Sequence, residues 1–235
     1  MSDPLSLSIV VPVWMEAAGV VETLEALQPL RAAGHELIVV DAGSTDGTAG
    51  LASPLADAVV QAGKGRAVQM NAGASVAKGG VLLFLHADTR LPSSALNYLD
   101  KFFQSDKAWG RFDVRLSGQS AMFRVIAWFM NQRSRLTGIC TGDQALFVRR
   151  DVFEALGGFA SLPIMEDIEF SSRLRLVSRP FCIEEPVTTD SRRWDQGGVW
   201  HTIFLMWRLR WRYWRGESPE TLVHSYRSDV RNAKD

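Results

Sequence analysis

The segment 84–89 places a single carboxylate, Asp88, directly after a run of apolar residues. Burial at that position is costly unless a cation pairs with the charge. A divalent ion that bridges two phosphates is such a partner, because Mg²⁺ favours one or two protein carboxylates together with phosphate oxygens. His86, two residues earlier on the same side of an extended chain, could ligate a softer ion or bond a phosphate. A helix cap near Pro92 is the alternative, but the position at the end of a strand favours the metal site.

Asp41 ends another apolar run and precedes a turn that contains Gly43 and Gly47. The two glycines permit turn conformations and close backbone approach, and Ser44 or Asp46 can cap the next helix. A capped turn needs no ligand. A carboxylate at the end of a strand nevertheless points toward the crevice in which α/β sheets bind ligands, so Asp41 can also accept hydrogen bonds from a nucleotide base or ribose.

The segment 63–66 forms a basic turn before a helical pattern that contains Asn71. Backbone N–H groups at the start of a helix attract anions, and Lys64 and Arg66 add positive charge there. A solvated basic turn has the same sequence, so an anion site and a surface turn both stay open.

Glu166 and Asp167 form an acidic pair after a loop with two glycines at 157–158. Adjacent carboxylates in the first turn of a helix are favoured by the helix dipole, which needs no catalytic role. Loops that follow a scaffold element also often carry catalysis, and a carboxylate there could act as general base toward an acceptor hydroxyl.

Strands and helices must position these residues. Three short runs, 7–13, 36–40 and 80–85, are apolar on both alternating faces, as expected of strands that helices cover on both sides. Between them, helical periods lie at 16–33, 48–52 and 65–77, and a further candidate strand lies at 58–60. This alternation predicts an α/β fold with a doubly wound, mostly parallel sheet and helices on both faces.

After residue 91 the alternation breaks. Helices are expected at 93–104, 120–135, 150–156, 166–175 and 200–215, and strands at 109–116, 145–148 and 181–184. The stretch 138–144 is expected to line the acceptor side of a site.

Taken in order, these residues resemble the inverting glycosyltransferases of family 2, which have the GT-A fold. The resemblance covers residues 7–195 and depends on five ordered segments, 9–16, 39–48, 65–73, 86–89 and 166–167. Arg192-Arg193-Trp194 is similar to the late Arg-Trp motif of that family. More narrowly, the short chain resembles a bacterial subgroup of small, largely uncharacterised transferases.

The resemblance implies transfer of a sugar, with inversion, from a nucleotide-diphosphate donor to an acceptor hydroxyl. Asp88 matches the metal-binding acid of the Asp-X-Asp motif, and Asp167, beside Glu166, matches the catalytic base. The first acid of that motif is His86 here, so Asp88 with His86 would hold Mg²⁺ or Mn²⁺. The residues placed at the nucleotide-sugar are Pro12, Val13, Glu16, Asp41, Ser44, Asp46, Lys64, Arg66, Asn71, Ala87, Arg193 and Trp194.

The sequence contains no internal repeat, low-complexity tract or linker, which predicts one domain, 1–235. We expect a nucleotide-sugar-binding half near 7–92, an acceptor and catalytic half near 93–195, and a helical extension at 196–235. Arg66 and Arg193 would help neutralise the departing diphosphate while Asp167 removes the acceptor proton.

Two other functions have weaker support. Nucleotidyltransferases share this sheet architecture but usually carry a Gly-rich basic loop after the first strand, where this chain has Pro12 to Glu16 without a glycine. A non-catalytic sugar-nucleotide-binding protein is disfavoured by the intact Asp88 and Asp167. A dinucleotide oxidoreductase is disfavoured because no Gly-X-Gly-X-X-Gly follows the first strand.

The bulk composition limits the class of binding partner and the cellular compartment. The chain has 26 basic and 26 acidic residues, so no basic excess predicts a nucleic-acid partner. Cys140 and Cys182 are too few for a disulfide framework and predict buried thiols in a reducing compartment. The sequence shows no secretory signal and no apolar run of the roughly 20 residues that span a bilayer, which predicts a cytoplasmic protein.

The segment 200–215 is rich in Trp and Arg. At 100° per residue, one stripe contains Trp200, Ile203, Phe204, Trp207, Trp211 and Trp214, whereas Leu205, Met206 and Leu209 fall opposite and Arg208, Arg212 and Arg215 flank them. Two apolar faces need two partners, of which one is the enzyme body. The other could be a membrane surface, a second subunit forming a homodimer, a lipid-linked acceptor, or a second layer of the same fold. Trp and Arg suit an anionic lipid interface, so we hypothesise peripheral contact with the inner face of the membrane.

Overall fold

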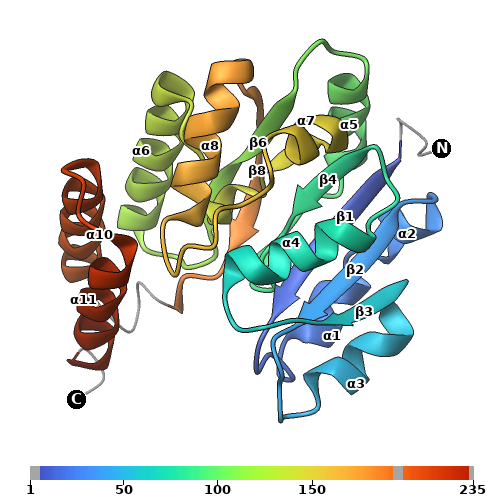
Figure 1. The fold of residues 1–235 in the computed structure, drawn as a ribbon, viewed down its shortest axis with the longest axis horizontal. Coiled ribbons are helices and arrows are strands. Elements are labelled where there is room, and N and C mark those ends of the chain that lie inside the picture. The colour runs from blue at the N-terminus through green and yellow to red at the C-terminus, as the bar shows by residue number, and fades with distance from the viewer. Residues whose placement is uncertain (1–5, 193–197, 233–235) are drawn as a thin grey trace.

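The computed structural model describes residues 6–192 and 198–232, and a single mixed sheet forms the centre of this part of the chain (Figure 1). Its strands are β1 (Leu7–Val13), β2 (Glu36–Asp41), β3 (Ala58–Gln61), β4 (Val81–Phe84), β5 (Thr89–Arg90), β6 (Trp109–Leu116), β7 (Phe147–Arg149) and β8 (Phe181–Thr189). Their order across the sheet is β3-β2-β1-β4-β7-β6-β8-β5. The first four of these are mutually parallel, and so are β6 and β8, whereas β7 and β5 pair antiparallel with their neighbours. The expected mostly parallel α/β architecture is confirmed.

The helices cover both faces of this sheet (Figure 1). They are α1 (Val20–Glu25), α2 (Gln28–Ala32), α3 (Thr48–Ala52), α4 (Arg66–Val76), α5 (Ala95–Phe103), α6 (Ala121–Thr137), α7 (Arg150–Ala155), α8 (Glu166–Val177), α10 (Val199–Trp214) and α11 (Pro219–Asn232). Side chains of β1 alternate between two cores, because Ile9 and Val11 pack with Leu24 of α1 while Val10 packs with Met70 of α4. A strand that is apolar on both faces is therefore explained by its two helical covers.

Three local differences from the sequence expectation have identifiable causes. The expected helix at 16–33 is two short helices, because Pro29 occupies the first turn of α2 and has no N–H to continue the ladder of α1. The strand expected at 145–148 begins at Phe147, since Ala145 has a left-handed φ of 46°. β8 continues past Glu184 to Thr189, beyond the predicted strand, whereas α11 lies within the helical extension predicted at 196–235.

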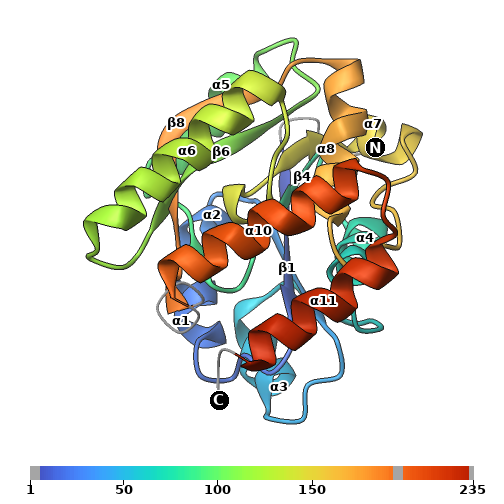
Figure 2. The same ribbon diagram turned by 90° about the vertical axis from the view of Figure 1, so that its left-hand side faces the viewer.

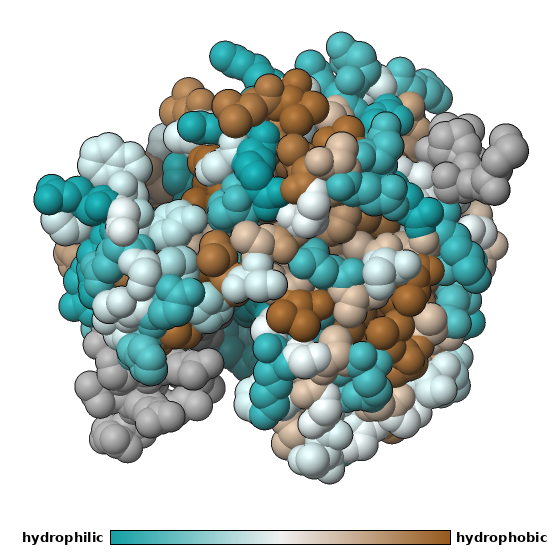
Figure 3. All heavy atoms as spheres, viewed as in Figure 1, coloured by the Kyte–Doolittle hydropathy of each residue, from teal (hydrophilic) through white to brown (hydrophobic). Residues whose placement is uncertain are grey.

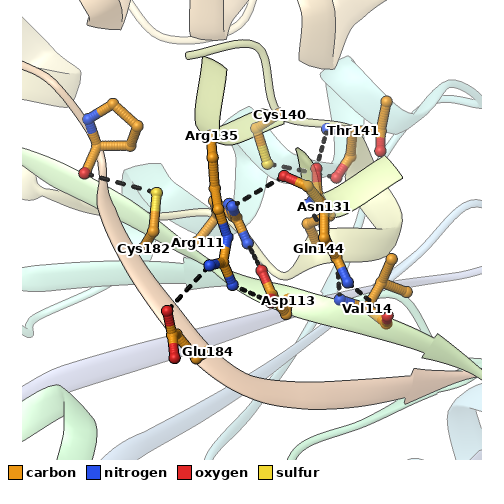
Figure 4. A network of polar contacts seen from close by, with 11 residues as sticks. Arg111, Asp113, Val114, Asn131, Arg135, Cys140, Thr141, Gln144, Cys182 and Glu184 are labelled. Atoms are coloured by element: carbon orange, nitrogen blue, oxygen red, sulfur yellow. Dashed lines mark hydrogen bonds and ion pairs between the residues drawn. The ribbon is translucent and has the colours of Figure 1, made fainter. Parts of the chain in front are cut away.

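A buried polar network fastens α6 to β6 (Figure 4). Asp113 of β6 forms ion pairs with both Arg111 and Arg135. The Asn131 side chain accepts the Val114 N–H at 2.9 Å and donates to the Val114 carbonyl at 3.0 Å. Because one acid neutralises two guanidinium groups here, removing Asp113 would leave buried positive charge without its partner.

The two C-terminal helices pack side by side, and α10 lies between α6 and α11 (Figure 2). Leu205 and Leu209 of α10 are buried in a small core with Met165, while Ile203 packs against α6. The opposite stripe is not buried: Trp200, Phe204, Trp207, Trp211 and Trp214 are between 57% and 80% exposed. One apolar face of α10 therefore contacts the enzyme body as expected, and burial between two layers of the same fold is excluded for the other. None of the described helices combines the length and apolarity needed to cross a bilayer.

Candidate active site

The carboxyl ends of β1, β2 and β4 open onto one cavity of about 630 Å³. The cavity contains eight of the residues that the sequence places at the nucleotide-sugar or the metal, namely Pro12, Val13, Glu16, Lys64, Arg66, His86, Ala87 and Asp88. This space is called the first cavity below. Parallel strands deliver these side chains to the same edge, as the doubly wound pattern predicts.

A second cavity of about 430 Å³ adjoins the first. Trp14, Arg66 and His86 line both, so the two cavities share one wall. Glu166 and Asp167 line the second cavity together with Thr141, Gly142 and Asp143. The stretch 138–144 thus lies beside the acidic pair, and the molecular surface is hollowed between the C-terminal helices and the parallel half of the sheet (Figure 3).

The carboxylate of Asp167 is held by two backbone donors. Oδ2 accepts the Gly142 N–H at 2.7 Å, and Oδ1 accepts the Ile168 N–H at 2.7 Å. The residue before the acidic pair, Met165, has a left-handed φ of 70°, a conformation that a side chain with a Cβ adopts at a cost. The turn and the hydrogen bonds aim Asp167 into the second cavity, where it could accept a proton from a bound hydroxyl.

Glu166 is almost completely buried beside Asp167. Burial, and then the negative charge of Asp167, raises the pKa of the Glu166 carboxyl, while Arg66 acts in the opposite direction. Neighbouring protein atoms partly desolvate Arg66 and disfavour its charge, but the carboxylates of Glu166, Asp143 and Asp167 outweigh that effect and raise the pKa of Arg66. Arg66 therefore stays cationic at the wall between the cavities, where a departing diphosphate would need positive charge.

Two carboxylates repel each other in the first cavity. Burial, and then the charge of Asp88, raises the pKa of Glu16, and Arg192 and Arg66 only partly offset this. A hard divalent cation would relieve this repulsion and fits the oxygen chemistry of the pair. Within the described residues no group of three metal-ligating side chains is present, so a cation here would depend on phosphate oxygens from a ligand as well.

His86 faces the loop of the second cavity. Its Nδ1 lies 3.7 Å from Oδ1 of Asp143, and a Cβ built on Gly142 would lie 2.3 Å from its Cε1. The imidazole ring thus packs against Gly142. The side chain of Glu16 interacts electrostatically with that of Asp88. The metal-ligand role of His86 stays a prediction.

Asp41 has one carboxylate oxygen in use and one without a partner. Oδ2 accepts the N–H groups of Gly43 and Ser44, each at 3.0 Å, whereas no hydrogen bond reaches the buried Oδ1 within the described chain. A buried acceptor without a donor is costly, and a base or ribose hydroxyl would supply one. Asp41 lines neither of the two cavities, so its nucleoside role stays a prediction with which the orphaned oxygen is compatible.

Three of the expected donor-binding residues have structural partners. Ser44 Oγ accepts the Met15 N–H at 2.8 Å, and Asp46 Oδ2 accepts the Ala17 N–H at 3.0 Å, so both hold the loop after β1. Asn71 bonds both its amide groups to the backbone of Phe159 and lines neither of the two cavities. Arg193 and Trp194 lie outside the described residues.

Sequence reasoning missed several residues that line the site. Gln69 ties the ends of two strands together by donating to the carbonyls of Val13 and Val40, each at 2.9 Å. Trp14 lines both cavities, and Nζ of the predicted Lys64 lies 4.4 Å from the centroid of its ring. Arg210 and Tyr226 enter the second cavity from α10 and α11, and no local motif announces either of them. The only related signal in the sequence was the Trp–Arg pattern of 200–215, which indicated that this helix has two apolar faces but did not place Arg210 in a cavity.

Comparison with known proteins places this geometry in a family. The model of Glycosyl transferase family 2 matches residues 8–157. The chain belongs to that family. Its matched region contains the first cavity and the wall shared with the second.

Curated relatives are longer proteins. The chain is 28% identical over 196 residues to a beta-monoglucosyldiacylglycerol synthase of Nostoc sp., covering 71% of this chain and 41% of that protein. It is 29% identical over 199 residues to the beta-monoglucosyldiacylglycerol synthase of a Synechocystis species, with 71% and 40% covered. The chain therefore spans about two fifths of the length of these relatives.

Solved structures show the same fold. S. aureus TarS 1–349 in complex with UDP-GlcNAc has a TM-score of 0.66 at 18% identity, over 80% of this chain and 59% of that one. The mannosyltransferase PcManGT of Pyrobaculum calidifontis, in complex with GDP-Man and Mn²⁺, has a TM-score of 0.62 at 21% identity, over 89% and 62%. The expected GT-A fold is confirmed.

The raised pKa of Glu166 predicts how stability depends on pH. The folded protein holds this proton more tightly than the unfolded chain does, so the stabilising contribution is complete below the ordinary pKa of a glutamate and is lost as the pH rises through the raised value. We expect Glu166→Gln to become more stable than the wild type as the pH increases from 4 to 8, measured as the free energy of unfolding in urea. Glu25→Gln, at an exposed position of α1, is the control and should follow the wild type. Parallel curves for wild type and Glu166→Gln would contradict the assignment.

Proposed function

We propose that this chain is an inverting glycosyltransferase that moves a sugar from a nucleotide-diphosphate donor to a hydroxyl of an amphiphilic acceptor. The observation that carries the proposal is the shared wall of Trp14, Arg66 and His86, with Asp88 on one side of it and Asp167 on the other. A donor in the first cavity and an acceptor in the second would meet at that wall. Membership of the family and the GT-A fold support this assignment.

Each carboxylate has a separate task in this reaction. Asp167 removes the proton of the acceptor hydroxyl, whose oxygen attacks the anomeric carbon as the bond to the diphosphate breaks. Because the base lies across the wall from Asp88, attack and departure occur on opposite faces of the sugar, which inverts the configuration. The Gly142 N–H fixes the base, and Arg66 places positive charge where the diphosphate leaves.

Asp88 and Glu16 would hold a divalent cation, Mg²⁺ or Mn²⁺, with His86 as a further candidate ligand. Such an ion supplies charge neutralisation of the leaving diphosphate when it is bound. The support is the repulsion between the two carboxylates and their place in the first cavity. Two solved structures with this fold contain Mn²⁺, PcManGT and the glucosyl-3-phosphoglycerate synthase of Mycobacterium tuberculosis.

The acceptor is proposed to be a lipid, reached at a membrane surface. The relatives are named for the synthesis of a monoglucosyldiacylglycerol. The exposed aromatic stripe of α10 continues onto α6, where Trp128 and Phe129 are 56% and 61% exposed. Arg208 and Arg215 are exposed on α10 beside that stripe, and together the two residue types suit an anionic bilayer.

Asp167→Asn tests the base. Asparagine preserves the acceptor for the Gly142 N–H but cannot take a proton, so we expect transfer to fall by about 10²–10⁴-fold while nucleotide binding persists. Labelled UDP- and GDP-sugars with a total lipid extract measure transfer, and calorimetry with the nucleoside diphosphate measures binding. Asp151→Asn, exposed on α7, is the control. Unchanged turnover in Asp167→Asn would contradict this role.

Asp88→Asn tests the metal. We expect Mn²⁺-dependent binding of UDP or GDP to weaken by at least the roughly 10–100-fold seen when a group that only orients a metal ligand is changed. Titrations with and without Mn²⁺ isolate the metal-dependent part, and Asp106→Asn, at a 90% exposed side chain away from the site, serves as control. Equal Mn²⁺ dependence in Asp88→Asn and wild type would remove Asp88 from the metal site.

Vesicle sedimentation tests the membrane contact. We expect the full chain to bind phosphatidylcholine vesicles that contain phosphatidylglycerol, and Trp211→Ser combined with Trp214→Ser to weaken binding by roughly tenfold or more, since each loses a large apolar contact. Leu176→Ser, at an 82% exposed apolar residue of α8, is the matched control. Failure to bind vesicles would contradict the contact. A concentration-dependent dimer abolished by the Trp substitutions would instead assign the stripe to a subunit interface.

A further inference from the structure

An apolar groove of about 560 Å³ runs between α6 and α10. Its walls are mostly hydrophobic and include Val125, Phe129 and Met130 of α6 and Trp200, Ile203 and Trp207 of α10. Asp143, Met206 and Arg210 line both this groove and the second cavity, so the groove leads from the exposed aromatic surface to the catalytic carboxylate. Its volume lies within the range of small-molecule sites.

Two arginines close the inner end of the groove. Arg133 of α6 and Arg210 of α10 both line it, and Nε and Nη2 of Arg133 are buried without a hydrogen-bond partner. No hydrogen bond or ion pair of Arg210 is found within the described chain, but none of its nitrogens is among the buried donors that lack a partner. Desolvation, and then the charge of Arg133, lowers the pKa of Arg210 to about 10. Desolvation also lowers the pKa of Arg133.

The arrangement calls for an anion. Two guanidinium groups that repel each other and lack hydrogen-bond acceptors are unfavourable until an acidic group satisfies both. Asp143 and Asp167 attract them electrostatically, but this attraction leaves the donors of Arg133 without an acceptor. A phosphodiester offers two non-bridging oxygens that share a negative charge, and a monoester offers three such oxygens, so a phosphate can accept hydrogen bonds from both guanidinium groups at once.

We propose that the acceptor is a phospholipid-like amphiphile whose phosphate binds Arg133 and Arg210 and whose hydrocarbon chain lies in the α6–α10 groove. A free hydroxyl of the same head group then reaches Asp167 through the second cavity. This inference rests on the proposed glycosyltransferase function and specifies the acceptor of that site. A neutral lipid would leave the arginines unsatisfied, and an apolar helix of another protein would bury them against hydrocarbon.

The test compares three probes on the full chain by calorimetry: decyl phosphate below its micelle concentration, decyl maltoside and inorganic phosphate. We expect decyl phosphate to bind at least about tenfold more tightly than either of the others, because only it offers both the charge and the chain. Arg133→Gln with Arg210→Gln should lose about tenfold or more of the decyl phosphate affinity and none of the decyl maltoside affinity. Arg210→Lys should restore part of it, and Arg124→Gln, exposed on α6, should behave as wild type.

Val125→Trp provides a second variant that leaves both arginines intact. Val125 is a 46% exposed residue of the groove wall, and the larger ring should weaken decyl phosphate without changing inorganic phosphate. Equal affinities for decyl phosphate and decyl maltoside, or an unchanged double variant, would overturn the inference. UDP and GDP titrations with Mn²⁺ on the same samples separate the two proposals: nucleotide binding without preference for decyl phosphate defeats only the acceptor inference, whereas absent nucleotide binding defeats the proposed function.

Discussion

The hydrogen bond from the Gly142 N–H to Asp167 joins three parts of the chain at one point. Asp167 belongs to α8, Gly142 to the loop after α6, and His86, which packs on Gly142, to the end of β4. A side chain at position 142 would collide with the imidazole, so only glycine allows this approach. The direction of the Asp167 carboxylate thus depends on the backbone N–H of a glycine that packs against His86. His86 links the donor side to the acceptor side even if it never touches a metal.

The loop that carries Gly142 is itself anchored by the network under α6. Asn131 binds the backbone of β6 and approaches Gln144 at 3.5 Å, while Arg135 reaches Asp113 (Figure 4). A buried ion pair adds little net stability compared with apolar packing, but its geometry is specific. Here that specificity fixes how α6, one wall of the groove, lies against the sheet.

Sequence patterns predicted which residues gather at the first cavity better than which residues line the second. Val13 and Asp88 lie at or just after the ends of apolar runs, and parallel strands carry such residues to one edge, so local pattern was enough to place them in one cavity. Asp41, at the end of β2, lines neither cavity. Asn71 shows the limit, because its position five residues after Arg66 does not reveal that the Phe159 backbone occupies its side-chain amide. Arg133 and Arg210 meet only because α10 packs on α6, a tertiary contact with no sequence motif. The periodicity of α10 revealed its two apolar faces but not which of them is exposed to solvent.

Like charges face each other on both sides of the wall. Glu16 and Asp88 repel in the first cavity, and Arg133 and Arg210 repel beyond the second. The chain's opposite charges only partly compensate either pair, so each pair favours a ligand of the opposite sign: a cation with its diphosphate on one side, an acidic head group on the other. Repulsion held in a rigid frame is a form of preorganisation, because the energy needed to assemble the charges is spent in folding rather than in binding. It would also separate the proposed substrates, since an anionic acceptor would be repelled from Glu16 and Asp88 and attracted to the arginines. Along the site, negative charge at Glu16 and Asp88 is followed by positive charge at Arg66, negative charge at Asp167 and positive charge at the two arginines of the groove. This alternation would direct the proposed donor and acceptor to opposite sides of the same wall.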